Sequence, residues 1–205
     1  MTATDKPAMA VEGMVREHPL NPAQLTSQLT PAEDLFVLAH MGIPETSVEN
    51  WSFTIGGRVE TPIELDYAQL LARPKRVLET VHQCAGSPMN PTAPTRRVAN
   101  VRWGGADLAV LLDEAGLSGD ATHLWAYGVD HGIFAKEEQD SYLKDIPLSR
   151  ISEGDVLIAY ELNGAPLPQK HGYPARLVVP GYFGTNSVKW LSRLEVADRR
   201  ADSIF

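Results

Sequence analysis

Residues 157–196 read LIAYELNGAPLPQKHGYPARLVVPGYFGTNSVKWLSRLEV, a stretch in which short apolar runs alternate with turn-forming residues. The first run ends at Asn163-Gly164, a dipeptide typical of a two-residue β-hairpin turn. Two further runs, ARLVVP at 175–180 and SVKWLSRLEV at 187–196, also have the composition of strands. The stretch therefore predicts strands joined by turns, rather than parallel strands joined by crossover helices.

Three more strands are predicted outside this stretch. WSFTIGGRVE (51–60) alternates apolar and polar residues and then reaches Gly56-Gly57, which indicates a hairpin turn. RVLETVHQC (76–84) and THLWAYGVD (122–130) are rich in β-branched and aromatic residues. Strands outnumber helices, and neither a regular βαβ alternation nor a GxGxxG motif occurs. The expected fold class is therefore α+β, with mixed, mainly antiparallel sheets and short helices.

Short helices are predicted at three places. ADLAVLLDEAG (106–116) places leucines on one face and ends in a glycine that suits the helix C-terminus. LDYAQLLARP (65–74) begins at a capping Asp66 and is ended by a proline. TPAEDLF (30–36) carries Thr30 at the N-cap position and a glutamate three residues later, as in a capping box.

Length and charge narrow the class of protein. The 205 residues are expected to form one domain over 30–205, preceded by an extended polar arm at 1–29. A formal net charge of -8 argues against a nucleic-acid partner, because phosphate neutralisation requires a basic face. The sequence contains neither a secretory h-region nor a transmembrane run. We therefore expect a cytoplasmic protein without a membrane span.

The single cysteine lies in VHQCAGSPMN (81–90), where a predicted strand breaks into a loop rich in small residues and proline. A thiolate in such a loop is a good ligand for soft metals, and the lack of a CxxC partner excludes zinc ribbons and iron–sulfur clusters. Two other interpretations of Cys84 stay open on the residues alone. One is a buried small side chain, and the other is a nucleophile assisted by His82.

A second candidate site lies in HGYPARLVVPGYFGTNSVKWL (171–191). His171, Arg176 and Lys189 are interleaved there with glycines, which allow the backbone to approach a ligand closely. An arginine fork and a lysine beside free N–H groups suit a phosphate or a polar ring. The alternative is a buried hairpin whose charged residues are solvated at its rim.

Four segments together resemble the molybdenum-cofactor-binding domain of the sulfite oxidase family. In chain order they are LTPAEDLFVLAHMGIP, HQCAG, NVRWGGADLAVLLDEAGL and the long run quoted first, and they fall within roughly residues 30–196. The resemblance implies an α+β domain of mixed sheets around a deeply held pyranopterin, with molybdenum-molybdopterin as the cofactor. It also implies oxidoreductase activity by oxygen-atom transfer, chemistry that side chains alone do not supply.

The resemblance also implies roles for individual residues. Cys84 matches the cysteine that is the sole protein ligand of molybdenum, and His40 matches a histidine that contacts the pterin. Asp130 aligns with an acidic residue near the pterin.

The phosphate side of the cofactor is matched by a second group. His171 and Arg176, in HGYPAR, match the pair that binds the polar ring and phosphate. Ser187 and Lys189, in SVKW, match phosphate and pterin contacts.

The substrate side departs from the family pattern. Met89 stands where sulfite oxidases have an arginine that grips sulfite, and a thioether offers no donor to an oxyanion. Arg96, Arg97 and Arg102 are candidates to replace it. Tyr142 is a candidate proton donor near the metal. A sulfite-like anion and a sulfoxide or N-oxide therefore both stay open as substrates.

The resemblance also bears on partners. A small-molecule substrate and an external electron carrier are expected. The sequence does not continue into the family's C-terminal dimerisation domain, so a monomer is favoured. Two other classes remain as alternatives, a non-catalytic molybdopterin-binding protein and a cysteine-dependent enzyme without metal.

Overall fold

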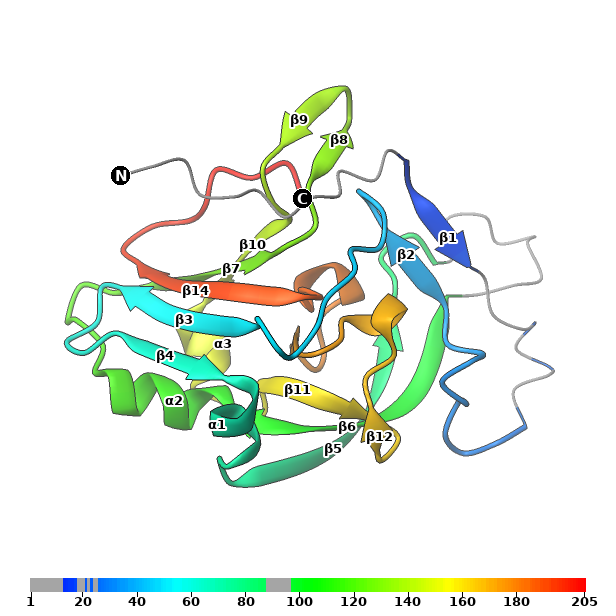
Figure 1. The fold of residues 1–205 in the computed structure, drawn as a ribbon, viewed down its shortest axis with the longest axis horizontal. Coiled ribbons are helices and arrows are strands. Elements are labelled where there is room, and N and C mark those ends of the chain that lie inside the picture. The colour runs from blue at the N-terminus through cyan, green and yellow to red at the C-terminus, as the bar shows by residue number, and fades with distance from the viewer. Residues whose placement is uncertain (1–12, 18–20, 22, 24–25, 88–96) are drawn as a thin grey trace.

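The structure of the protein, a computed structural model, describes residues 13–17, 21, 23, 26–87 and 97–205. Two five-stranded sheets dominate this part of the chain. Figure 1 shows the two sheets as separate layers, with the helices α1 and α2 on one side and a short β1–β2 pair on the other. The predicted α+β class with mainly antiparallel sheets is confirmed.

The first sheet has the strand order β10-β7-β14-β3-β4. The strands are β3 Ser52–Gly57, β4 Ile63–Asp66, β7 His123–Gly128, β10 Leu143–Pro147 and β14 Leu191–Ala197. Neighbouring strands are antiparallel except β14 and β3, which run parallel. The sheet is therefore mixed, as expected.

The second sheet has the order β12-β11-β6-β5, and a further strand, β13, also pairs with β11. The strands are β5 Lys75–Gln83, β6 Val98–Asp107, β11 Leu157–Leu162, β12 Ala165–Pro166 and β13 Arg176–Val178. All of these pairings are antiparallel. The Asn163-Gly164 turn joins β11 to β12 as predicted, with φ values of 54° and 85°.

Two small strand pairs stand outside these sheets. The strand β1 Val15–Glu17 pairs with β2 Val37–Ala39, and β8 Gly132–Phe134 pairs with β9 Glu137–Gln139. Both pairings are antiparallel.

The helices are short. They are α1 Tyr67–Leu71, α2 Leu108–Ala115 and α3 Leu148–Ile151, with 3₁₀ turns η2 Gln169–His171 and η3 Gly184–Asn186. Asp66 and Gln69 form a reciprocal capping box at the start of α1, and Gly116 follows α2 at φ 69°. The helices predicted over 65–74 and 106–116 are thus confirmed.

The hydrophobic core occupies both faces of the second sheet. Ile158 and Tyr160 of β11 face a large cluster that includes the first sheet and α2. Leu157 and Ala159 face a smaller cluster that contains Cys84. Because alternate residues point to opposite faces and both faces are buried, the first four residues of β11, 157–160, are all apolar or aromatic.

One local prediction is wrong, and a second is confirmed with its turn displaced. Residues 30–36 form a turn instead of a helix, because Thr30 is used by β6: its amide donates to Asn100 O at 2.8 Å and its hydroxyl accepts from Asn100 N at 3.2 Å. The hairpin predicted at 51–60 is present, because β3 pairs antiparallel with β4, but the turn follows Gly57 and does not lie at Gly56-Gly57. A side chain at Gly57 would meet Val196 O on β14 at 2.3 Å, so this glycine permits the close parallel pairing.

Candidate active site

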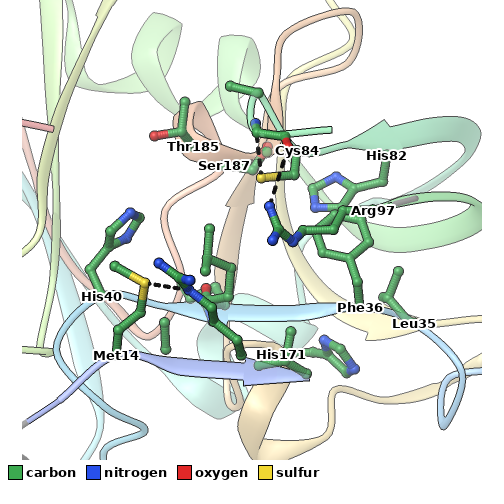
Figure 2. A pocket seen from close by; sticks show the side chains of 18 of the residues that line it. Met14, Leu35, Phe36, His40, His82, Cys84, Arg97, His171, Thr185 and Ser187 are labelled. Atoms are coloured by element: carbon green, nitrogen blue, oxygen red, sulfur yellow. Dashed lines mark hydrogen bonds between the residues drawn. The ribbon is translucent and has the colours of Figure 1, made fainter. Parts of the chain in front are cut away.

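A cavity of about 560 Å³ opens beside the second sheet. Its walls come from β1, from residues 35–40, from the segment 82–87 that follows β5, and from the segment 184–189 that precedes β14. Figure 2 shows side chains from these separate segments facing a common space. All eight predicted site residues line it: His40, Cys84, Asp130, Tyr142, His171, Arg176, Ser187 and Lys189.

Cys84 lies directly after the last residue of β5 and is 7% exposed. Its amide donates to Arg97 O at 2.9 Å, and the amide of Ser87 donates back to Cys84 O at 3.0 Å. The amide of Gly86 donates to Cys84 Sγ at 3.4 Å. The end of β5 and the turn that follows it thus hold the sulfur at the cavity wall.

Arg176 is a buried cation without a carboxylate partner among the described residues. It is 3% exposed, and its Nη1 and Nη2 donate to the carbonyls of His171 and Ser187 at 3.0 and 2.9 Å. Its guanidinium also lies 4.9 Å from the Trp103 ring. Burial lowers the pKa of Arg176 to about 9. An anion in the cavity would offset this cost.

Lys189 adds a second cation to the same wall. Its Nζ donates to Leu38 O at 3.1 Å and to Lys170 O at 3.4 Å, and lies 4.2 Å from the Trp190 ring. Burial, and then the charge of Arg176, lower the pKa of Lys189 below its ordinary value. The printed hydrogen bonds of both cations go to main-chain carbonyls, and the carboxyl of Asp130 is near enough for its charge to act on Lys189.

The turn that brings these cations together depends on Gly172. This residue has φ 106°, and a Cβ there would approach Cβ of both Arg176 and Lys189 at about 3 Å. His171 precedes it, with Nε2 3.3 Å from Ala32 O. Burial, followed by the charges of Arg176 and Lys189, lowers the pKa of His171 to about 3, so the ring is neutral at pH 7. Ser187 Oγ accepts from the amide of Val179 at 3.1 Å and keeps its own proton to donate.

Asp130 supplies a buried acceptor. The residue is 5% exposed, and its Oδ1 has no hydrogen-bond partner among the described residues. Burial raises the pKa of this carboxyl. Buried polar atoms are nearly always satisfied, so this oxygen indicates a donor that the polypeptide does not provide.

His40 and Tyr142 form another part of the lining. Their rings stack with centroids 5.6 Å apart. Tyr142 Oη donates to Thr185 O at 2.8 Å and lies 2.8 Å from Thr185 Oγ1. Burial raises the pKa of Tyr142 to about 12, and burial followed by the charge of Lys189 lowers that of His40 to about 4. At pH 7 the phenol is therefore protonated and the imidazole is neutral.

These observations fit a pterin cofactor that carries a phosphate and a metal. The cavity volume lies in the range of small-molecule sites. Its lining offers a thiol for a soft metal, two cations and a hydroxyl for a phosphate, and an unsatisfied carboxylate oxygen for ring N–H groups. No cluster of three or more His, Cys, Asp or Glu side chains able to hold a metal occurs among the described residues.

Sequence comparison decides the family. The profile described as the oxidoreductase molybdopterin binding domain matches residues 40–205. The chain belongs to this molybdopterin-binding family. It is 33% identical to the sulfite oxidase of Gallus gallus over 201 residues. It is 30% identical to the NADPH nitrate reductase of Pichia angusta, covering 91% of this chain and 23% of that protein.

A solved relative shows the same architecture. The structure of the sulfane dehydrogenase SoxCD from Paracoccus pantotrophus matches with a TM-score of 0.78 at 31% identity. The match covers 88% of this chain and 46% of that one. The chicken sulfite oxidase match covers 89% of this chain and 43% of that protein. The chain thus spans less than half the length of these two relatives, and it matches the part that the molybdopterin-binding profile describes.

Of the arginines predicted to replace the family's substrate arginine, the structure places Arg97 at the cavity and Arg102 away from it. Arg97 lines the cavity, and Figure 2 shows it beside Cys84. Arg102 lies on the outer face of the second sheet and pairs with Glu79 at 2.5 Å. Met89 and Arg96 lie outside the described residues.

Sequence reasoning missed the contribution of the N-terminal segment to this molybdopterin-binding domain. Met14 and Arg16 line the cavity, although nothing in their local pattern singles them out. The pairing of β1 with β2 brings them there. His82, which the sequence offered as a possible assistant to Cys84, also lines the cavity and stacks on Phe36 with centroids 5.6 Å apart. In the described chain, no helix is long and apolar enough to cross a bilayer.

Proposed function

We propose that this protein is a molybdenum-cofactor-dependent oxidoreductase that transfers an oxygen atom to or from a small substrate and exchanges electrons with an external carrier. The observation that carries the proposal is the position of the only cysteine. Cys84 lies at the wall of a cavity whose other polar residues suit a phosphorylated pterin.

Each lining residue has a role toward the cofactor. Cys84 Sγ binds molybdenum. The guanidinium of Arg176, the ammonium of Lys189 and the hydroxyl of Ser187 bind the phosphate, since all three residues line the cavity and carry N–H or O–H donors. His171 positions Arg176 by accepting from it through its main-chain carbonyl.

The pterin ring is held by the remaining residues. Asp130 Oδ1 accepts from a ring N–H, which satisfies an otherwise unpaired buried oxygen. His40 contacts the ring and is held by its stacking on Tyr142.

When bound, the cofactor supplies two-electron redox chemistry coupled to oxygen-atom transfer. The polypeptide excludes water from the cofactor and supplies a proton to the reaction. Tyr142 is the proposed proton donor, because it lines the cavity and its Oη carries a proton at neutral pH. Thr185 holds that hydroxyl in place through its carbonyl and its own hydroxyl.

The relatives support this assignment through what their names state, sulfite oxidase, nitrate reductase and sulfane dehydrogenase. All three are oxidoreductases that act on small molecules. We extend that class of activity to this chain as a proposal, together with a monomeric state and a cytoplasmic location.

Elemental analysis and substitution of Cys84 test the proposal. The purified protein should contain about one molybdenum per chain. Cys84→Ala should abolish turnover while much of the pterin stays bound, because the phosphate contacts are unchanged. Purified protein without molybdenum that still turns over substrate would refute the proposal, and so would full activity in Cys84→Ala. Retention of pterin with no activity in the wild type would identify a non-catalytic binding protein instead.

A further inference from the structure

The short strand β1 brings a further arginine, Arg16, to the active-site cavity. In the β1–β2 register, Arg16 lies opposite Leu38, a residue of the cavity wall. The next residue, Glu17, pairs with Lys170 at 2.7 Å, which ties β1 to the body of the domain. Met14 and Arg16 both line the cavity, and Figure 2 shows Met14 on the same side as His40 and well separated from Cys84.

Most N–H donors of the Arg16 guanidinium have no hydrogen-bond partner among the described residues. Its Nε donates to Met14 Sδ at 2.9 Å, and no other hydrogen bond or ion pair joins it to a described residue. A guanidinium carries five N–H donors in a planar fork. Arg16 is exposed, whereas Arg176 is 3% exposed, so the two arginines lie at the mouth and in the interior of the cavity.

The charges that line the cavity are unbalanced. Arg16, Arg176 and Lys189 face one carboxylate, that of Asp130, among the described lining residues. The field of Arg16 reaches into the cavity, where it contributes to the lowered pKa of His40 after burial and Lys189. The chain as a whole carries a formal charge of -8, so this cluster reverses the local potential at the cavity.

The cofactor accounts for only part of this cluster. If Arg176 and Lys189 bind the phosphate, as the proposed function requires, their charges are matched inside the cavity. Arg16 at the mouth is then left facing the route by which a substrate enters.

We propose that Arg16 is a substrate-binding residue that selects a small anion, so that the N-terminal strand forms part of the active site. This inference rests on the proposed function and narrows its substrate class. An anion at the mouth accepts from the free edge of the Arg16 guanidinium while Arg97 contributes charge from the Cys84 side. The apolar side chains of Leu38 and Met14 lie beside Arg16 and carry no oxygen atom that would compete with an anion for its donors.

Inorganic sulfate is the probe. It is titrated calorimetrically into the cofactor-loaded full chain at constant ionic strength. The variants are Arg16→Gln, Arg16→Lys and Arg102→Gln. Arg102 is the control. It is an exposed arginine of β6 that pairs with Glu79 and does not line the cavity. Molybdenum and pterin contents are measured on every sample.

We expect one saturable sulfate site in the wild type and a dissociation constant about tenfold higher in Arg16→Gln, because a charge-assisted contact at a partly solvated mouth is lost. Arg16→Lys should give an intermediate value, since the charge stays and the fork is lost. Arg102→Gln should match the wild type. With a turnover assay, KM for an anionic substrate should rise in Arg16→Gln while kcat changes little.

Several results would overturn the inference. Wild-type protein that binds no sulfate, equal affinity in Arg16→Gln, or an equal loss in Arg102→Gln would each do so. Loss of molybdenum or pterin from Arg16→Gln would make Arg16 a cofactor contact instead. Molybdenum content separates the two claims: its absence from the wild type refutes the proposed function and this inference together. Full molybdenum with unchanged sulfate affinity in Arg16→Gln refutes this inference alone.

Discussion

Replacement of Arg176 by methionine should change cofactor affinity strongly and the stability of the cofactor-free fold only slightly. Arg176 is buried, carries no carboxylate partner among the described residues and donates to the main-chain carbonyls of His171 and Ser187 and, at 3.5 Å, of Leu177. Arg150 provides a matched control, because it is also a buried arginine but binds Asp155 through two hydrogen bonds of 2.6 and 3.1 Å. Arg150 does not line the active-site cavity.

The expected magnitudes follow from the two environments. Burial lowers the pKa of Arg176 to about 9, so the charged guanidinium is buried at a cost on the order of 5 kcal/mol, which the substitution relieves. Against this, the two carbonyls bound by Nη1 and Nη2 lose their donors at about 1–3 kcal/mol each. The unfolding free energy of the cofactor-free protein should therefore change by no more than about 3 kcal/mol in Arg176→Met. Arg150→Met breaks a real ion pair and should cost roughly 2–4 kcal/mol.

Cofactor retention should show the reverse order. Loss of a charge-assisted phosphate contact in Arg176→Met should cost on the order of 1.5–3 kcal/mol, or about 10- to 100-fold in cofactor affinity. Arg150→Met should retain the cofactor as the wild type does. Urea denaturation followed by tryptophan fluorescence measures stability, and molybdenum and pterin analysis after dialysis measures retention. A loss of more than about 4 kcal/mol in cofactor-free Arg176→Met, or full retention by that variant, would refute the reasoning.

Three further predictions test other parts of the structure. Between about pH 3 and 6.5 unfolded His171 binds a proton that the folded residue does not, so stability of the cofactor-free protein should rise with pH there. In His171→Asn the unfolding free energy should rise less steeply with pH, by up to about 1.4 kcal/mol per pH unit, as measured by urea denaturation. Equal slopes in the variant and the wild type would contradict the conclusion that burial keeps His171 neutral. Tyr142→Phe should keep its molybdenum but lose about 10²-fold or more in kcat, and an unchanged kcat would exclude Tyr142 as the proton donor. Asp66→Ala removes the capping box of α1 and should cost about 1 kcal/mol in urea denaturation without changing cofactor content.

Strands and helices with a local cause could be predicted from the sequence. The capping box at Asp66, the apolar face of 108–115 and the Asn163-Gly164 turn each act within a few residues, and all three are present. The helix expected over 30–36 failed for a reason that no local pattern contains. Thr30 is a residue type that favours the N-cap position. Its hydroxyl and amide are instead hydrogen-bonded to β6, some seventy residues later in the chain.

The same distinction applies to the active site. Cys84, Arg176 and Lys189 stand in long motifs whose resemblance to a known family assigns them together, and the structure does bring them to one cavity. Arg16 has no such motif. It reaches the cavity only because a three-residue strand pairs with β2, and such a short non-local pairing leaves little periodicity in the sequence.

X-ray absorption at the molybdenum edge tests the central claim, the bond between Cys84 and the metal, most directly. Wild-type protein and Cys84→Ser would be compared after loading with cofactor, with pterin content measured on both samples. We expect the serine variant to lose one sulfur from the metal's coordination shell while the sulfurs that the pterin supplies remain. An identical sulfur shell in the two proteins, or pterin-loaded wild-type protein without molybdenum, would contradict it.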